Sequence, residues 1–401
     1  MIKNMTIFFL SNYFDHHAKP LSDALDKLTG GGYRFLGSQK MTDERIALGW
    51  GNIDIPSYVN YVNMEKPENI RYWQQEIANA DIVIQGSSPF ELLSSRNKTD
   101  KITFYYAERL YKERVSYRKV YERIVKDWLM SRRPTPTTYM LSASAYNPYD
   151  FSLLGYFRNK TYRWGYFTEC KHYNLDGLFT QKKESRIIEP LGVSILWAGR
   201  LIGLKHPDLV IEVADRLRQQ GYKYEMNIIG TGELEEPLKN EVLQKNLSES
   251  VHFLGSMKPT EVRSYMERSD IYLFTSDFNE GWGAVLGEAM ASGCAVVTSH
   301  GIGATPFLAQ HKENALVYET GNVDSLYRNV KRLMDSEALR TRLSRNAIET
   351  MQNLWNANVG AERFYNVVRA LINEEPVSEY ENGPMSRAVL LKNNWFKDDT
   401  V

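Results

Sequence analysis

Hydrophobic residues along this chain gather in runs of strand length, and several of the stretches between them carry apolar residues at helical spacing. In the first half, runs expected to be strands are residues 5–10, 81–85, 101–106, 139–144 and 162–167. Helices are predicted at residues 21–28 and 72–79. Alternation of buried strands with helices is typical of a parallel, doubly wound sheet.

The second half of the chain repeats this alternation more regularly. Strands are predicted at residues 193–198, 224–229, 251–254, 270–274, 294–297 and 314–318. Helices are predicted at residues 207–219, 233–243 and 259–268, with closing helices at 324–334, 337–351 and 356–372. Two Rossmann-like α/β domains in series are the simplest account of this pattern.

The boundary between the domains is expected where periodicity fades. Residues 169–191 are polar and charged, which makes them the best linker candidate. We therefore predict an N-terminal domain at 1–180, a C-terminal domain at 181–372 and a tail at 373–401. The tail is polar and aperiodic, and packing against the N-terminal domain is one arrangement open to it.

Composition excludes some classes of protein. The chain has 401 residues, 49 basic and 49 acidic, so its formal net charge of zero gives no general attraction to nucleic acid. No apolar run has the length of a transmembrane helix, and residues 5–10 fit a first strand better than a signal peptide. Cys170 and Cys294 are expected to be free thiols in a reducing compartment. These features predict a cytoplasmic protein.

The most informative stretch is residues 269–298, which predicts a strand, a loop, a helix and a second strand. The loop lies at the carboxyl end of its strand, which is where open α/β sheets bind ligands. Gly281 and Gly283 permit close approach of a ligand to the backbone. The helix that begins after Gly283 offers N–H groups and a dipole that favour an anion.

Two acidic residues accompany this helix start. Glu280 lies in the loop, and Glu288 follows eight positions later, two turns into the helix, so both can line one crevice. A carboxylate accepts two hydroxyls in the way that a sugar ring or a ribose presents them. The alternative is a loop charge and a solvated helix residue without function. We favour the functional interpretation because both acids accompany a Gly-x-Gly helix start between apolar strands.

Two basic residues follow the predicted strand at 193–198. Gly199 and Arg200 end that strand and Lys205 lies five residues after Arg200, just before the next predicted helix. An arginine fork and a lysine point charge suit a diphosphate, although surface loops carry both residues routinely. Gly230 begins a Gly-x-Gly turn after the following strand, which alone is weak evidence.

These segments resemble a known family. Glu280-Gly281-Trp282-Gly283, followed by Glu288, resembles the E-x7-E signature of the retaining, nucleotide-sugar-dependent glycosyltransferases of family 4. Residues 199–217 are similar to the block of the same family in which an Arg and a Lys hold the donor diphosphate. The family usually has Phe at the place of Trp282, and often Gly where His206 stands.

The resemblance implies the GT-B fold, an α/β architecture in which two Rossmann-like domains face each other across a cleft. It implies that Arg200 and Lys205 hold the diphosphate, Glu280 the sugar hydroxyls and Glu288 the ribose. Gly199, Gly230, Gly281, Trp282 and Gly283 would lie against the nucleotide sugar. It also implies catalysis without a metal or cofactor and with retention at the anomeric carbon.

The acceptor side is less defined by the sequence. The glycine-rich turn that the family places after its first strand is absent, and the polar turn here contains His16 and His17. Either histidine could orient an acceptor hydroxyl, or simply cap the turn. Where many family members have a catalytic His, Glu108 stands here and either substitutes for it or leaves the role unfilled.

Residues 108–133 are predicted to form a long basic helix with interleaved aromatic residues. Such a helix is usually a solvated surface. The alternative is that this helix makes peripheral contact with the anionic inner face of the cell membrane.

The expected function is transfer of a sugar from a UDP-type or GDP-type donor to a glycan or lipid-linked glycan in bacterial cell-surface polysaccharide synthesis. The alternatives are a non-catalytic subunit that binds nucleotide sugars and a GT-B sugar-nucleotide epimerase.

Overall fold

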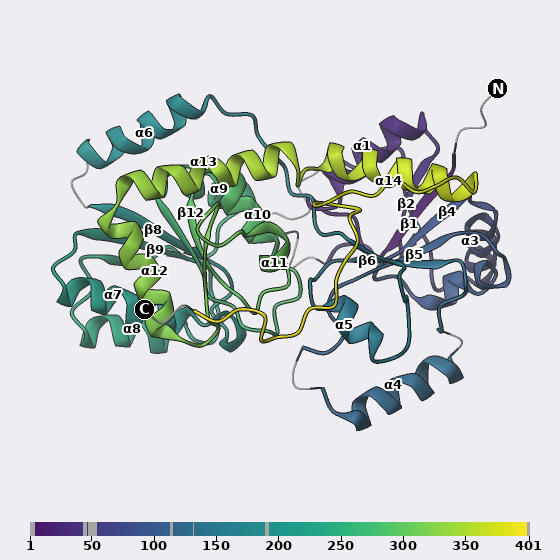
Figure 1. The fold of residues 1–401 in the computed structure, drawn as a ribbon, viewed down its shortest axis with the longest axis horizontal. Helices are drawn as coiled ribbons and strands as arrows, with labels where there is room; N and C mark the ends of the chain where they lie inside the picture. Colours follow the sequence, from purple (N-terminus) through teal and green to yellow (C-terminus); the bar gives the residue numbers. More distant parts are fainter. Residues whose placement is uncertain are drawn as a thin grey trace. The chain divides into compact units, whose positions relative to one another are not determined.

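The chain forms two compact units, and one of them is built from two separate stretches of sequence. The computed structural model describes residues 5–42, 46, 54–112, 115–130, 132–188 and 192–398. The first unit comprises Met1–Thr168 and Trp355–Lys392, and the second comprises Glu169–Leu354 and Asn393–Val401. Each unit contains one parallel sheet flanked by helices (Figure 1).

The sheet of the first unit has seven parallel strands in the order β3-β2-β1-β4-β5-β6-β7. Its strands are β1 (Ile7–Ser11), β2 (Tyr33–Gly37), β3 (Val59–Tyr61), β4 (Ile82–Gln85), β5 (Thr103–Ala107), β6 (Thr138–Ser142) and β7 (Thr161–Arg163). The strand order reverses between β1 and β4, as in doubly wound folds. The strands predicted in this half are confirmed, whereas β2 and β3 were not predicted.

Aromatic and aliphatic side chains of these strands form the core of the first unit. Helices in this unit include α1 (Lys19–Thr29), α3 (Pro67–Asn79), α4 (Tyr117–Leu129), α5 (Asn147–Ser152) and α14 (Ala357–Ile372). Figure 1 shows α14 alongside α1, although more than 300 residues separate them in sequence. The ring of Phe364 on α14 lies 5.0 Å from the ring of Phe104 on β5, so α14 is part of this core.

The sheet of the second unit has six parallel strands in the order β10-β9-β8-β11-β12-β13. Its strands are β8 (Val193–Ala198), β9 (Tyr224–Ile229), β10 (Val251–Phe253), β11 (Ile271–Phe274), β12 (Ala295–Ser299) and β13 (Leu316–Tyr318). All six predicted strands are present, and most of their residues are buried, because helices cover both faces of the sheet. The order reverses between β8 and β11.

Because the strand order reverses, helices cover both faces of this sheet. The helices are α6 (Leu175–Ile188), α7 (Pro207–Gln219), α8 (Glu235–Gln244), α9 (Pro259–Arg268), α10 (Ala284–Ala291), α11 (Thr305–Leu308), α12 (Val323–Asp335) and α13 (Glu337–Asn353). Figure 1 shows α9, α10 and α13 on one face and α7, α8 and α12 on the other. The fold class, two parallel α/β domains, is confirmed.

The predicted domain boundaries differ from those of the structure in several places. Residues 169–191 were expected to be a linker, but α6 occupies residues 175–188 and belongs to the second unit. The buried ammonium of Lys182 on α6 donates to the backbone oxygens of Ser269, 2.6 Å away, and Gly293, 2.7 Å away. This buried contact fixes α6 to the second unit, which begins at Glu169 and not at residue 181.

The C-terminal boundary also differs. The closing helix α14 was assigned to the C-terminal domain, but its apolar face packs in the first unit. The tail expected at 373–401 divides between the units at residue 393, with its earlier part in the first unit. Periodicity predicted the helix correctly but carried no information on which core it joins.

The long helix predicted at 108–133 is shorter in the structure. It begins only at Tyr117, where Ser116 caps it by accepting from the backbone N–H of Lys119. The buried carboxylate of Asp150 accepts the backbone N–H groups of Leu110 and Tyr111 at 3.0 Å each. These two N–H groups therefore bond to a side chain and not to a preceding helical turn.

Both cysteines are free thiols, as predicted. Burial raises the pKa of each to about 11, so neither favours the reactive thiolate at neutral pH. No helix within the described ranges combines the length and the apolar character needed to cross a bilayer.

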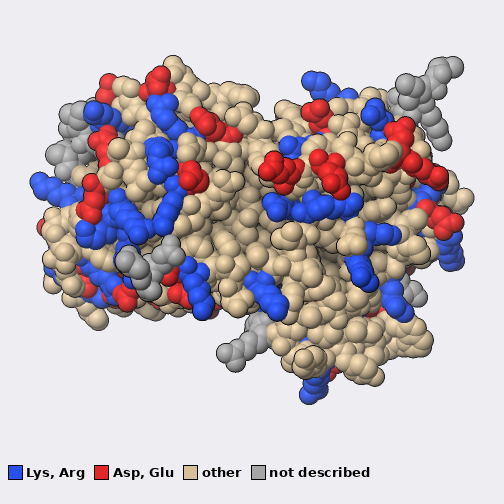
Figure 2. Space-filling model, in the orientation of Figure 1, with Lys and Arg blue, Asp and Glu red and all other residues tan. Residues whose placement is uncertain are grey.

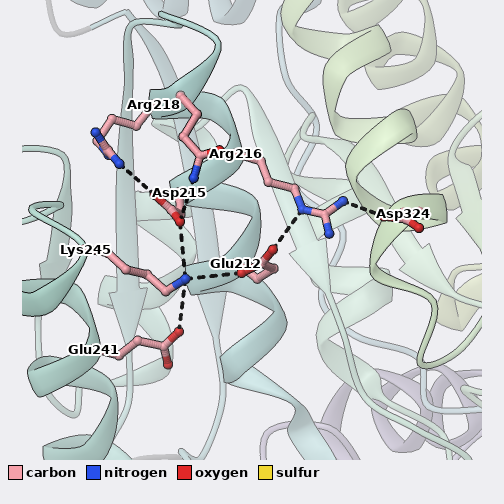
Figure 3. Close-up of polar contacts among 8 residues, drawn as sticks. Glu212, Asp215, Arg216, Arg218, Glu241, Lys245 and Asp324 are labelled. Atoms are coloured by element: carbon pink, nitrogen blue, oxygen red, sulfur yellow. Dashed lines mark hydrogen bonds and ion pairs between the residues drawn. The ribbon is translucent and has the colours of Figure 1, made fainter.

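A network of ion pairs ties three helices together on the surface of the second unit (Figure 3). Lys245, after α8, lies 3.2 Å from Asp215 and 3.3 Å from Glu212, both on α7. Arg216 of α7 reaches Asp324 of α12 at 2.6 Å. The network bridges elements that are far apart in sequence, so it constrains packing more than a pair within one helix does.

Lys245→Met is expected to lower the free energy of unfolding by about 1 kcal/mol, since a partly buried cation shared by several carboxylates is lost. The difference should shrink in 1 M salt because of screening. Urea unfolding followed by circular dichroism measures it. Lys239→Met removes an exposed lysine that pairs with Glu235 and Glu236 of its own helix, and should change little. Equal losses in the two variants would contradict a role for the network.

Candidate active site

Two loops that carry predicted donor residues meet at the reversal point of the second sheet. Strands β8 and β11 are neighbours, and the chain leaves them toward opposite faces of the sheet. The loops that follow them, residues 199–206 and 275–283, therefore emerge side by side at the carboxyl edge. Such a reversal point is where open α/β sheets bind ligands.

Hydrogen bonds join these two loops directly. The backbone N–H of Asp277 donates to the oxygen of Leu204 at 3.0 Å, and the hydroxyl of Thr275 donates to the oxygen of Lys205 at 2.6 Å. The indole of Trp197, at the end of β8, donates to the Thr275 hydroxyl at 2.9 Å. Thr275 and Trp197 are buried, so these hydrogen bonds join the two loops from within the protein.

Lys205 and Glu280, predicted from separate motifs, meet across these loops. The Lys205 ammonium forms an ion pair with Oε2 of Glu280, and both side chains are about 15% exposed. An ammonium has three donors, and the second carboxylate oxygen can still accept hydroxyl groups. The pair thus presents a positive charge and a hydrogen-bond acceptor next to each other, which suits a diphosphate joined to a sugar.

Glycines allow the neighbouring turns to approach this surface. Gly230, after β9, has φ 129°, and a Cβ there would lie 1.9 Å from the oxygen of Gly199. Gly283 has φ 84° as the N-cap of α10, and a Cβ there would lie 2.7 Å from the ring of Phe274. A side chain at either position would push the turns apart.

Glu288 lies on α10 near the end of β8. Burial raises the pKa of Tyr272 well above its usual value, and the negative charge of Glu288 acts in the same direction. The Tyr272 hydroxyl donates to the backbone oxygen of Ala198 at 3.0 Å. Glu288, half-buried, is therefore close to the strand end from which Gly199 and Arg200 follow.

The remaining donor candidates differ in exposure. Arg200 is exposed, as expected of a side chain that meets a ligand. Gly281 is buried. Trp282 is 1% exposed, and its ring lies 6.2 Å from Phe307, so its indole belongs to the core. A contact between Trp282 and a donor would have to come from the backbone.

His206, to which the sequence assigned no role, is part of this surface. Its Nε2 lies 3.3 Å from Asp277, and its Nδ1 lies 3.7 Å from Asp208. A hydrogen bond with Asp208 raises the pKa of His206, although burial opposes this. Its φ of 47° is left-handed, a conformation that favours glycine.

The candidates of the first unit also form a cluster, at the carboxyl edge of their own sheet. The rings of His16 and His17, after β1, have centroids 3.9 Å apart, and His17 lies 6.2 Å from Tyr166. The Tyr166 hydroxyl donates to Glu108, after β5, at 3.0 Å. Burial raises the pKa of Tyr166 well above its usual value, and Glu108 adds to this. The Tyr166 hydroxyl therefore stays protonated and is the donor in its hydrogen bond to Glu108.

Tyr166 was not singled out from the sequence. A tyrosine near the end of a short strand, in a chain with 25 tyrosines, carries no distinguishing signal. Its position became informative only when the fold placed it between His17 and Glu108.

These features define a two-domain α/β protein of the Rossmann type with candidate sites at the carboxyl edges of its sheets. The family model "Glycosyl transferases group 1" matches residues 181–350. Over this region the chain is similar to the group 1 glycosyl transferases.

Curated relatives match part of the chain. The amylovoran biosynthesis glycosyltransferase AmsK of Erwinia amylovora is 33% identical over 165 residues, 40% of each chain. The N-acetylgalactosamine-N,N'-diacetylbacillosaminyl-diphospho-undecaprenol 4-alpha-N-acetylgalactosaminyltransferase of Campylobacter jejuni is 33% identical over 147 residues, 36% of this chain and 38% of that protein. The chain spans about two fifths of the length of the relatives it matches.

Solved structures are similar over most of the chain. Anabaena Alr3699/HepE in complex with UDP has a TM-score of 0.66 and 14% identity, covering 91% of this chain and all of that one. WaaG, a glycosyltransferase involved in lipopolysaccharide biosynthesis, has a TM-score of 0.59 and 14% identity, covering 90% and 99%. At this identity the likeness establishes the fold, which is GT-B.

Proposed function

We propose that the protein is a glycosyltransferase that moves a sugar from a nucleoside diphosphate to a glycan or lipid-linked glycan. The observation that carries the proposal is the ion pair of Lys205 and Glu280 on the joined loops at the reversal point of the second sheet. Departure of a diphosphate leaves negative charge on its oxygens, and positioned cations stabilise that charge. Lys205 and Arg200 supply the charge without a metal.

Each donor residue has a distinct part in this proposal. Arg200, exposed after β8, and Lys205 hold the diphosphate. Glu280 accepts hydroxyls of the sugar through its second oxygen, and Glu288 accepts those of the ribose. The amino terminus of α10 at Gly283 adds its dipole to the cations. Gly199, Gly230 and Gly281 let the donor approach the backbone. The transfer in this proposal retains the configuration at the anomeric carbon.

A uridine donor and a polysaccharide or lipid-linked acceptor are the finer part of the proposal. HepE, which shares the fold, is described in complex with UDP and with UDP-glucose. The Erwinia relative is named for amylovoran biosynthesis, and the Campylobacter relative for a diphospho-undecaprenol substrate. The His16, His17, Tyr166 and Glu108 cluster is the acceptor side in this proposal, with a histidine or Glu108 taking the acceptor proton.

Binding of UDP-sugars by the purified protein tests the proposal. Glu288→Gln is expected to weaken donor affinity by about 1.5–3 kcal/mol for each charge-assisted hydrogen bond lost, roughly ten-fold or more. Isothermal calorimetry measures this change. Glu249→Gln, in an exposed turn of the same unit, is the matched control. Unchanged affinity of Glu288→Gln would contradict its role on the ribose.

Turnover separates the enzyme from its alternatives. A transferase releases UDP from the donor in the presence of an acceptor, and product NMR reports the anomeric configuration. Tight binding without UDP release would favour a non-catalytic subunit. Conversion of the free nucleotide sugar into its epimer would favour an epimerase.

We also propose that α4 rests on an anionic membrane surface at the inner face of the cell membrane. Tyr117 is 98% exposed and Trp128 65% exposed, and Tyr121 lies between them in sequence. Positions i, i+4 and i+11 fall on one side of a helix, so the three rings form a single aromatic stripe. Figure 2 shows a mostly uncharged surface at the lower right, where Figure 1 places α4.

Basic side chains lie on other faces of the same helix. Arg118, Lys119 and Lys126 are exposed on the same helix and complement anionic headgroups, while Val120 and Ile124 face the core of the first unit. Exposed aromatic rings on one face of a helix and cations on another are typical of a helix that lies in the membrane interface.

Replacing Tyr117, Tyr121 and Trp128 together by Ser is expected to reduce binding to vesicles of phosphatidylglycerol at least ten-fold. The physical reason is loss of the apolar area that enters the interface. Vesicle sedimentation at low salt measures binding. Tyr72→Ser removes an aromatic residue that is 57% exposed on α3 and serves as control. Equal binding by the triple variant and the native chain would leave α4 as a solvated helix.

A further inference from the structure

The last described residues of the chain lie on the second unit, although the part of the tail before Asn393 groups with the first unit. The indole Nε1 of Trp395 donates to the backbone oxygen of His300 at 3.3 Å. The ring of Phe396 lies 6.0 Å from the ring of His300. We call residues 393–398 the C-terminal strap.

The strap is also held beyond His300. The ring of Phe396 lies 5.3 Å from the ring of His311. The carboxylate of Asp398, 8% exposed, forms an ion pair at 2.6 Å with Arg328 on α12. Burial opposes ionisation of Asp398, but bonds to Ser325 and Arg328 outweigh it and lower its pKa. The strap is thus a docked segment with aromatic and ionic contacts.

His300, 5% exposed, holds the start of the strap in its neutral form. The backbone N–H of Thr320 donates to Nδ1 of His300 at 2.9 Å, so this nitrogen must carry a lone pair. The proton therefore lies on Nε2, which donates to the backbone oxygen of Asn393 at 3.0 Å. A second proton on the ring would point at the N–H of Thr320.

The other side of His300 contacts the donor loop. The ring of Phe278 meets the ring of His300 edge to face at 5.2 Å. The same ring lies over Gly301, where a Cβ would be 3.2 Å from it. Phe278 is two residues before Glu280, within a turn closed by the N–H of Glu280 on the oxygen of Asp277 at 3.1 Å.

From this chain of contacts we propose that the C-terminal strap is a positioning element of the donor site, which acts through His300 and Phe278 on the loop that carries Glu280. The proposal rests on the proposed function for its effect on the donor. With the strap docked, His300 is fixed between Asn393 and Thr320 and supports Phe278. Without the strap, one side of His300 is open to water, and the loop that carries Glu280 loses part of the packing that supports it.

The strap should also respond to pH. Burial lowers the pKa of His300 and outweighs the hydrogen bonds with Asn393 and Tyr318 and the negative charge of Glu319, all of which act in the opposite direction. A lowered pKa means that docking is fully stabilised above the ordinary histidine pKa of about 6.5 and weakens as pH falls below it. Asp398 faces Arg328 and ionises well below this range, and His311 contacts only Phe396 of the strap among the rings described.

The test compares the full chain with a chain that ends at residue 392 and with Trp395→Ala/Phe396→Ala. Two readouts are used: amide hydrogen exchange of residues 275–283, and the dissociation constant of UDP from calorimetry at pH 7.5 and 5.5. Exchange of the loop should rise at least ten-fold in both variants, and UDP should bind at least five-fold more weakly at pH 7.5. Lys397→Ala, exposed on the strap, is the control and should match the full chain.

Each result bears on a separate claim. Unchanged exchange of residues 275–283 in both variants overturns the inference, whatever UDP does. Faster exchange with UDP affinity within two-fold of the full chain overturns the link to the donor. The full chain alone should lose affinity at pH 5.5, because the variants have already lost the docked strap. Failure of the full chain to bind UDP would count against the proposed function, while loop exchange would still decide whether the strap positions the loop.

Discussion

Lys205→Met is expected to lower the rate of sugar transfer by about 10²- to 10³-fold, the usual effect of removing one group that stabilises charge in a transition state. The charge on the leaving diphosphate grows as the sugar bond breaks, so the loss should fall mainly on kcat. Lys205 is held in place by Glu280 and by the bond from Thr275 to its backbone oxygen. Steady-state kinetics with a UDP-sugar donor measure the change.

Matched variants separate charge from structure. Lys205→Arg keeps the positive charge but not the point-charge geometry, and should recover part of the rate. Lys223→Met removes an exposed lysine of the same unit and should leave the rate unchanged. A melting temperature for Lys205→Met close to that of the native chain excludes misfolding as the cause. A rate of sugar transfer in Lys205→Met equal to that of the native chain would contradict the role of Lys205 on the diphosphate.

Arg96→Met is expected to destabilise the first unit by about 3–5 kcal/mol, because several buried carbonyl groups lose their donor at roughly 1–3 kcal/mol each. Arg96 is 1% exposed and donates to the backbone oxygens of Ala80, Asp81 and Ile102, with weaker bonds to the end of α3. Its Nε donates to the hydroxyl of Thr103. Without the guanidinium, several carbonyls at the starts of β4 and β5 would be buried without a donor.

Hydrogen exchange is the suitable measurement, because the two units need not unfold together. Protection of β4 and β5 should fall in Arg96→Met, while that of β8 and β11 should persist. Burial lowers the pKa of Arg96 to about 10, so it remains charged near neutral pH. Arg71→Met, on the exposed side of α3, is the control. Equal protection in the Arg96 and Arg71 variants would show that the buried carbonyls find other donors.

The second unit was largely predictable, because the local sequence identifies most of its strands and helices. Each strand there is a short apolar run, and most helices have a clear start and end, so periodicity alone gave their order, although α6 was taken for a linker. The order of Glu280, Glu288 and the glycines also located the helix start correctly, and Gly283 proved to be its N-cap. The ion pair between Lys205 and Glu280 lay beyond the sequence, because 75 residues separate them.

The first unit was less predictable for a physical reason. Strand β2 contains Arg34 and ends in a glycine, so it lacks the continuous apolar run by which the other strands were recognised. Tyr166 and His206 were missed because their importance depends on partners in other loops. Trp282 was read as a ligand contact because it lies in the motif, whereas its size makes the indole a core residue. The donor roles of the motif residues stay predictions.

The position of α14 also affects how the chain can be made and divided. Because Trp355–Lys392 completes the first unit, a ribosome supplies Glu169–Leu354, the main part of the second unit, before the last helix of the first. A nascent chain stopped near residue 354 would therefore leave the surface around Phe104 uncovered. Expression of the N-terminal portion on its own would accordingly require residues 355–392 to be spliced onto residue 168.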